Sequence, residues 1–167
     1  DAIAIRARAK IFTQIAAKQA QSSPKARLEW ISIACGAAVP IGDALRAIRA
    51  TSPDKDIHAT LTDFDREALG FAAGLLLGEG FGLTDEQFKI VESNLIKDLI
   101  FSKNLVDAYG PGRADLVDIL GLIDYFDHKK AALLLKNAYK LCAGNGTMVI
   151  SNILNTHPQL AMNQRAV

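Results

Sequence analysis

The segment ISIACGAAVPIGDAL, Ile31 to Leu45, decides the fold because it joins an apolar run to a helical pattern through residues with almost no side chain. LEWISIA (28–34) has little polar alternation, which is typical of a strand covered on both faces of a parallel sheet. Small residues at a strand end cost conformational entropy and contribute little packing. We therefore expect the backbone of residues 34–38 to lie close to a ligand.

Strand-like and helix-like segments alternate along the rest of the chain. Short apolar runs predict further strands, at 57–62, 87–93, 114–120 and 147–153. Apolar residues at helical spacing predict helices, at 1–21, 41–50, 65–77, 95–109 and 128–142. This order predicts an α/β fold, with a doubly wound, mostly parallel sheet and helices on both faces.

Polar and small residues mark several ends of these elements. Asp65 and Asp127 stand at the start of helical segments and are predicted N-caps. AGNG (143–146) is predicted to turn the chain between the last helix, which ends near Cys142, and the last strand.

Basic residues outnumber acidic ones in the first 27 residues. The predicted helix has one apolar stripe, formed by Ile5, Ala9, Phe12, Ile15, Ala16 and Gln19. Six basic residues face only one acid, Asp1; they are Arg6, Arg8, Lys10, Lys18, Lys25 and Arg27. We interpret them as a solvated helix face rather than a phosphate-binding surface.

Composition excludes several classes of function. The chain has 167 residues, 50% of them hydrophobic and 22% charged, with a net charge of +1, so no overall field favours nucleic acid or an anionic membrane. No apolar run approaches the ~18–20 residues of a membrane span, and no signal peptide is visible. Cys35 and Cys142 form no Cys-x-x-Cys pair, so we expect reduced thiols, no metal site and a cytoplasmic protein.

Ligands of such sheets bind at the carboxyl ends of the strands. The residues to consider are therefore those that follow the strands, at 34–40, 63–65, 94–95 and 121–126. The small-residue loop leads into a helix start, which favours an anionic group. Asp63 is placed to accept hydrogen bonds from two ribose hydroxyls, and the amide of Asn94 could bind an adenine edge.

These residues carry a family resemblance. ISIACGAAVP resembles the Gly-rich loop of class I S-adenosylmethionine-dependent methyltransferases through Cys35 and Gly36, and LTDFDREALGFA is similar to their second signature. ADLVDILGLIDYF resembles the fourth-strand signature, and LLLKNAYKLCAGNGTMVISN the helix, turn and fifth strand that follow it. The resemblance covers about residues 28–153. It implies a Rossmann-like core that binds S-adenosylmethionine and transfers its methyl group.

The resemblance also implies site residues. The cofactor would be bound by Ala34, Cys35, Gly36, Ala37, Asp63, Phe64, Asn94, Leu95, Gly121 and Leu122. On the acceptor side, the candidate catalytic residues are Asp124, Tyr125 and His128, with His128 as a possible base or a structural residue. His58 is interpreted as structural, and His157 as part of a loop that could cover the site.

The domain division follows from the same match. Residues 1–27 are expected to form a helix and linker that pack on the core, and 28–153 the cofactor-binding core. Residues 154–167 form a C-terminal segment too short for the antiparallel hairpin that usually closes this sheet. We expect the chain to be a piece of a longer protein.

The loop departs from the family pattern. Ser32 stands where many members have an acid, Ala34 and Ala38 replace two of three glycines, and Asn145 stands in the turn before Gly146. Alanine at 34 and 38 requires either negative φ angles or a strained loop.

Other functions remain as alternatives. A dinucleotide site would need G-x-G-x-x-G, which the chain lacks, and no Gly-Lys-Ser/Thr exists for a P-loop. Aminopropyl transfer is possible on the same architecture, and so is a non-catalytic scaffold or interaction domain.

The acceptor is expected to be a small molecule. LIDYFDH (122–128) lacks the Asn/Asp-Pro-Pro-Tyr/Phe loop of enzymes that methylate base amines or glutamine amides. Methyl transfer relies mainly on alignment and needs no catalytic triad. An oxygen or carboxylate acceptor is favoured, and the oligomeric state is left open.

Overall fold

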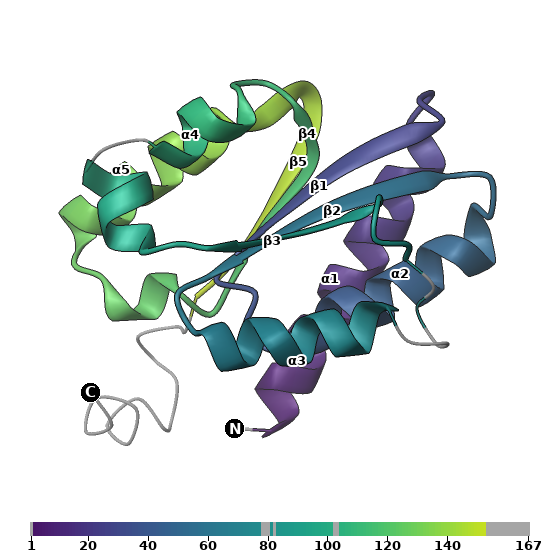
Figure 1. Ribbon diagram of the computed structural model, residues 1–167, viewed down its shortest axis with the longest axis horizontal. Coiled ribbons are helices and arrows are strands. Elements are labelled where there is room, and N and C mark those ends of the chain that lie inside the picture. Colours follow the sequence, from purple (N-terminus) through teal and green to yellow (C-terminus); the bar gives the residue numbers. More distant parts are fainter. Residues whose placement is uncertain (1, 78–80, 82, 102–103, 153–167) are drawn as a thin grey trace.

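Five parallel strands form one sheet in the order β3-β2-β1-β4-β5 (Figure 1). The structure is a computed structural model and describes residues 2–77, 81, 83–101 and 104–152. The strands are β1 (Arg27–Ile33), β2 (Asp56–Asp63), β3 (Phe88–Glu92), β4 (Ala114–Leu120) and β5 (Cys142–Ser151). The predicted parallel α/β fold is confirmed. The strand order reverses between β1 and β4, which is where ligands of such sheets bind.

Helices cover both faces of the sheet (Figure 1). One face carries α1 (Ala2–Ser22), α2 (Val39–Thr51) and α3 (Arg66–Leu77). The other carries the π-helix η1 (Ile96–Phe101), α4 (Asn104–Tyr109) and α5 (His128–Tyr139). A short 3-10 helix, η2 (Ile123–Tyr125), follows β4. The two apolar layers explain why β1 lacks polar alternation: Trp30 packs on the α1 side, and Ile31 and Ile33 on the α5 side.

Helix α1 runs antiparallel to the strands. Near its end, Gln19 donates hydrogen bonds of 3.2 Å to the backbone oxygens of Asp115 and Asn145, and its amide oxygen accepts one of 2.7 Å from Thr147. Near its start, Arg8 lies beside Ser151 at the other end of β5. The beginning of α1 therefore reaches the carboxyl ends of the strands.

One sequence prediction about the first helix is wrong, and one about a later helix gains detail. Ile5 was placed in the buried stripe of α1, but it is 54% exposed, because the buried stripe (Phe12, Ala16, Ala20) starts a turn or more further along. The segment predicted as helical over 95–109 is helical in its described residues, as the π-helix η1 and as α4, and residues 102–103 lie outside the description. Apolar periodicity does not distinguish the wider turn of a π-helix from that of an α-helix.

The AGNG turn was also wrong. These residues lie inside β5, which begins at Cys142 rather than after a turn. The register shifts there: Ala114 and Leu116 of β4 pair with Cys142 and Thr147 of β5, so five steps along β5 match two along β4. The glycines thus form an irregularity in the strand. The two N-caps are confirmed, since Asp65 accepts from the N–H of Glu67 and Asp127 from that of Lys130, both at 2.9 Å.

Candidate functional site

The loop after β1 has a strained backbone. Ala34, Gly36 and Ala38 all adopt left-handed conformations, with φ of 56°, 53° and 56°. A left-handed alanine costs about 1–2 kcal/mol. Of the two possibilities left open by the sequence, the strained loop is the one observed. Such strain persists only where the surroundings impose it, and it clusters at ligand sites.

Asp63 at the end of β2 holds this loop. Its Oδ2 accepts a 2.8 Å hydrogen bond from the N–H of Gly36, and its Oδ1 a 3.0 Å bond from the N–H of Asp65. The residue is only 6% exposed. A carboxylate has about four acceptor sites, so capacity for two more donors remains. The predicted ribose acceptor is thus also a structural tie between the β1 and β2 loops.

Gly36 leaves room beside the loop. A Cβ built on this residue would meet no heavy atom within 4 Å, apart from its chain neighbours. The φ of +53° independently disfavours any other residue at this position. The backbone of the loop therefore faces open space directly beside the carboxylate that holds it.

The end of β3 supplies one exposed and one buried residue. Asn94 is exposed, and its Oδ1 accepts a 3.1 Å hydrogen bond from the N–H of Lys97 at the start of η1. Leu95 is 5% exposed and packs in the apolar cluster below α5. The structure therefore places Asn94 at the surface of this edge and turns the side chain of Leu95 into the core.

The end of β4 is more open. Gly121 has φ of +83° and donates its N–H to Ser151 Oγ at 2.9 Å. Leu122 is half-buried, whereas Tyr125 is 66% exposed. Asp124 and His128 are both exposed.

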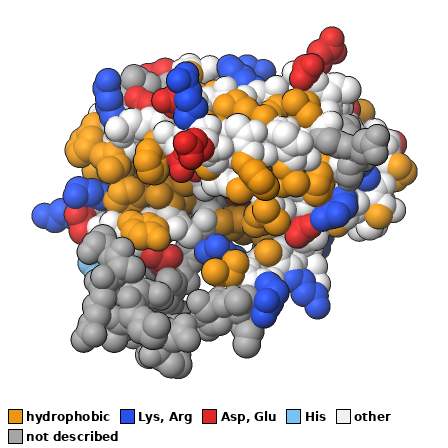
Figure 2. Space-filling model, turned by 60° about the horizontal axis from the view of Figure 1, so that its bottom comes forward, with side chains coloured by type: hydrophobic (Ala, Val, Ile, Leu, Met, Phe, Trp, Pro, Cys, Tyr) orange, Lys and Arg blue, Asp and Glu red, His pale blue; other side chains and the backbone are white. Residues whose placement is uncertain are grey.

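The β2 loop adds an apolar group to this edge of the sheet. Phe64, the residue after Asp63, is 75% exposed. Figure 2 turns the bottom of Figure 1 toward the viewer, and hydrophobic side chains gather over the face that it shows. Exposed apolar surface of this kind marks ligand or partner contacts.

Of the two remaining histidines, the structure describes His58, which lies away from these loops. His58 lies near the start of β2, at the amino ends of the strands, and its Nε2 is 2.9 Å from Asp56 Oδ2. This position agrees with a structural role. His157, predicted to lie near the site, is outside the described residues.

A buried carboxylate lies beneath the β1 loop, and sequence reasoning missed it. Asp118 of β4 is 1% exposed; its carboxylate accepts hydrogen bonds from Trp30 Nε1 at 2.7 Å and from Ser32 Oγ at 2.9 Å. Ser32 and Asp118 are paired in register. The carboxylate therefore lies on the strand next to Ser32, the position at which many members of the similar family have an acid. Burial raises the pKa of Asp118 to about 7. An acid within the apolar run of 114–120 was the available signal.

The same surroundings make Cys35 a weak acid. Burial, together with the negative charges of Asp63 and Asp118, raises the pKa of this thiol to about 12. Thiolates, not thiols, are the reactive form. Cys35 is thus a neutral part of the loop, and its thiol is free, as the sequence predicted.

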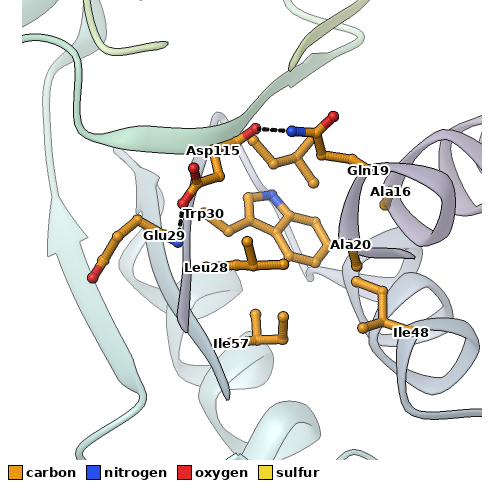
Figure 3. Close-up of a pocket in the computed structure, with 10 residues that line it drawn as sticks. Ala16, Gln19, Ala20, Leu28, Glu29, Trp30, Ile48, Ile57 and Asp115 are labelled. Carbon is orange, nitrogen blue, oxygen red and sulfur yellow. Dashed lines mark hydrogen bonds between the residues drawn. The ribbon is translucent and has the colours of Figure 1, made fainter. Parts of the chain in front are cut away.

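Two hollows lie away from the predicted site. The first lies between α1, α2 and the sheet, with the indole of Trp30 at its centre (Figure 3). There Asp115 accepts hydrogen bonds from the N–H of Glu29 and from the side-chain amide of Gln19. It has room for about one water molecule. The second is open to solvent and is lined by Arg49, Pro53, Asp54, Lys55, Asp56 and Gln87. It lies at the amino ends of β2 and β3, opposite the strained loop.

The described part of the chain offers neither a cluster of metal ligands nor a membrane-spanning helix. There, no three His, Cys, Asp or Glu side chains gather as a metal site would require. Nor does any described helix combine the length and apolar character that crossing a bilayer demands.

Comparison with known proteins gives structural neighbours only. No protein-family model and no curated protein matches the chain. A methyltransferase from Agrobacterium tumefaciens aligns with a TM-score of 0.61 and 10% identity, over 94% of this chain and 48% of its own. An O-methyltransferase family protein from Burkholderia thailandensis gives a TM-score of 0.57 and 20% identity, over 90% and 42%.

The neighbours also include a protein named for another reaction. The cyclase SpnF gives a TM-score of 0.55 and 13% identity, over 82% of this chain and 42% of its own. The chain thus spans less than half the length of these three structures. At these identities the likeness concerns architecture. The chain has the Rossmann-like fold of the class I S-adenosylmethionine-dependent methyltransferases.

Proposed function

We propose that this chain binds S-adenosylmethionine at the carboxyl ends of β1 and β2 and belongs to an enzyme that methylates a small molecule. The observation that carries the proposal is the tie between Gly36, in the loop after β1, and Asp63, at the end of the neighbouring β2. A strained, side-chain-poor loop beside a carboxylate with spare acceptor capacity suits an adenosyl ligand. The fold of the neighbouring methyltransferases supports the same choice.

Each residue has a distinct part in holding the ligand. Asp63 would accept hydrogen bonds from the ribose hydroxyls, and the open side of Gly36 would admit the ligand against the backbone. Phe64 and Asn94 would contact the adenine, through an apolar ring and an amide. The bound sulfonium supplies an activated methyl group. The chain contributes alignment, the term worth about 7–11 kcal/mol in such reactions.

The acceptor would lie over the loop that follows β4. Tyr125, Asp124 and His128 are exposed there, and Gly121 and Leu122 precede them. Their polar groups could orient a hydroxyl or carboxylate acceptor, and His128 could remove a proton from a hydroxyl. We therefore favour an oxygen or carboxylate acceptor over a nitrogen in a nucleic-acid base.

Ligand-dependent melting tests the proposal. S-adenosylmethionine and S-adenosylhomocysteine should each raise the melting temperature, because binding at 100 times Kd stabilises the folded state by about 2.7 kcal/mol. NAD should not. Gly36→Ala should abolish the shift by placing a methyl group in the open space, whereas Gly70→Ala, whose Cβ also meets no neighbour, should leave it intact. A chain that binds neither adenosyl compound would instead be a scaffold with this fold.

A further inference from the structure

We propose that Arg8 of α1 binds the amino-acid carboxylate of the adenosyl ligand, an inference that rests on the proposed function. Although Arg8 was counted with the solvated basic residues of the first helix, it is half-buried, whereas Arg6 and Lys10 on either side are exposed. Because α1 runs antiparallel to the strands, Arg8 lies at their carboxyl ends. It is there that the strained loop and Asp63 also lie.

The chain makes room for the guanidinium at this edge. A Cβ on Gly121 would lie 2.7 Å from Arg8 Nη1, so glycine at 121 lets the cation pass directly against the end of β4. Arg8 Nη1 is 3.4 Å from Ser151 Oγ, and that hydroxyl accepts the N–H of Gly121 at 2.9 Å. The cation is therefore held where β4 and β5 end, next to the point at which strand order reverses.

The guanidinium of Arg8 has N–H donors that no described residue takes up. Arginine carries five N–H groups, and within the described part of the chain the bond to Ser151 is the one recorded for Arg8, with no ion pair to a carboxylate. Neither of two buried acids nearby is recorded as a partner of Arg8: Asp63 accepts from the N–H groups of Gly36 and Asp65, and Asp118 from Trp30 and Ser32. A fork of N–H donors without an acid suits a carboxylate brought by a ligand.

The test compares two ligands that differ in one group. S-adenosylmethionine has a carboxylate, and decarboxylated S-adenosylmethionine keeps the sulfonium, the amine and the nucleoside. Titration calorimetry should show that Arg8→Gln weakens binding of S-adenosylmethionine about tenfold or more. Binding of the decarboxylated compound should be unchanged. Arg8→Lys should retain part of the preference, because it keeps the charge without the fork.

A matched control separates this effect from a disturbed helix. Arg6→Gln removes a positive charge from the exposed face of α1 and should alter neither affinity. If Arg8→Gln weakens both ligands by the same factor, or neither, the assignment of the carboxylate to Arg8 is wrong. If the unaltered chain binds neither compound, the proposed function fails first, and the inference with it.

Discussion

The backbone N–H of Gly36 and the carboxylate of Asp63 are joined by a 2.8 Å hydrogen bond that links the loop after β1 to the end of β2. Asp63→Ala should therefore have two effects. The N–H of Gly36 loses its acceptor, which should cost about 1–3 kcal/mol of unfolding free energy, and the ligand loses its ribose partner. Urea denaturation would measure the first effect and calorimetry with S-adenosylhomocysteine the second.

Asp65→Ala is the matched control for this change. It removes a neighbouring carboxylate that caps α3 and should cost about 1 kcal/mol of stability. The affinity for S-adenosylhomocysteine should not change. Equal affinity in the Asp63 variant and the parent chain would exclude Asp63 from the ligand site.

The left-handed alanines predict stabilising substitutions. Ala34→Gly and Ala38→Gly should each raise the free energy of unfolding by up to about 1 kcal/mol, since glycine relieves the strain but adds entropy to the unfolded chain. Ala37→Gly adds the same entropy at a position without positive φ, so it should destabilise. Chemical denaturation of the three variants checks this order, which would be contradicted if Ala37→Gly were the most stable.

The buried Asp118 predicts a pH dependence of stability. Its pKa is raised from 3.8 to about 7, so the folded chain holds a proton that the unfolded chain releases between these values. The contribution of this group to stability therefore falls as pH rises from about 4 to about 7. Asp118→Asn should remove that slope. The stability of the variant relative to the parent chain should therefore be higher at pH 8 than at pH 4. Parallel pH profiles for the two proteins would contradict this.

Gly42 in α2 should be replaceable only at a cost. A Cβ there would lie 2.5 Å from Phe81 Cε1, and the other contacts with the ring are 2.9 Å. The ring is buried and has the guanidinium of Arg46 4.5 Å from its centre. Gly42→Ala should destabilise by about 1–3 kcal/mol. Gly74→Ala in α3, whose Cβ meets nothing within 4 Å, should stabilise by about 0.5–1 kcal/mol, as thermal melts would show.

Element type and order were predictable because buried parallel strands and amphipathic helices have distinct periods. The small-residue loop after β1 and Asp63 at the end of β2 could also be named as candidates, since both lie where predicted strands end. What periodicity could not supply was the pairing between elements. The irregularity in β5 depends on which residues of β4 lie opposite Cys142 and Thr147, and that register is not written in either segment alone.

The missed features of the site have the same origin. Asp118 was not singled out from the sequence, because only the strand register shows that it pairs with Ser32 and meets Trp30. Arg8 looked like one more surface base, until the direction of α1 placed it at the end of β4. The burial of Leu95 likewise depends on the α5 cluster that its side chain joins, while its predicted contact with the ligand stays a prediction. Each case required the neighbour from another element.

The side-chain amide of Gln19 fixes the position of α1 along the strands of the sheet. Its three bonds to Asp115, Asn145 and Thr147 anchor the helix where β4 begins and β5 is irregular. A helix rises 1.5 Å per residue, so Arg8 is set about 16 Å from that anchor. The position of the Arg8 guanidinium is thus set by contacts at the opposite ends of the strands. A shift of α1 along its axis, or a change in its length between Arg8 and Gln19, would move this charge without altering any residue around the ligand.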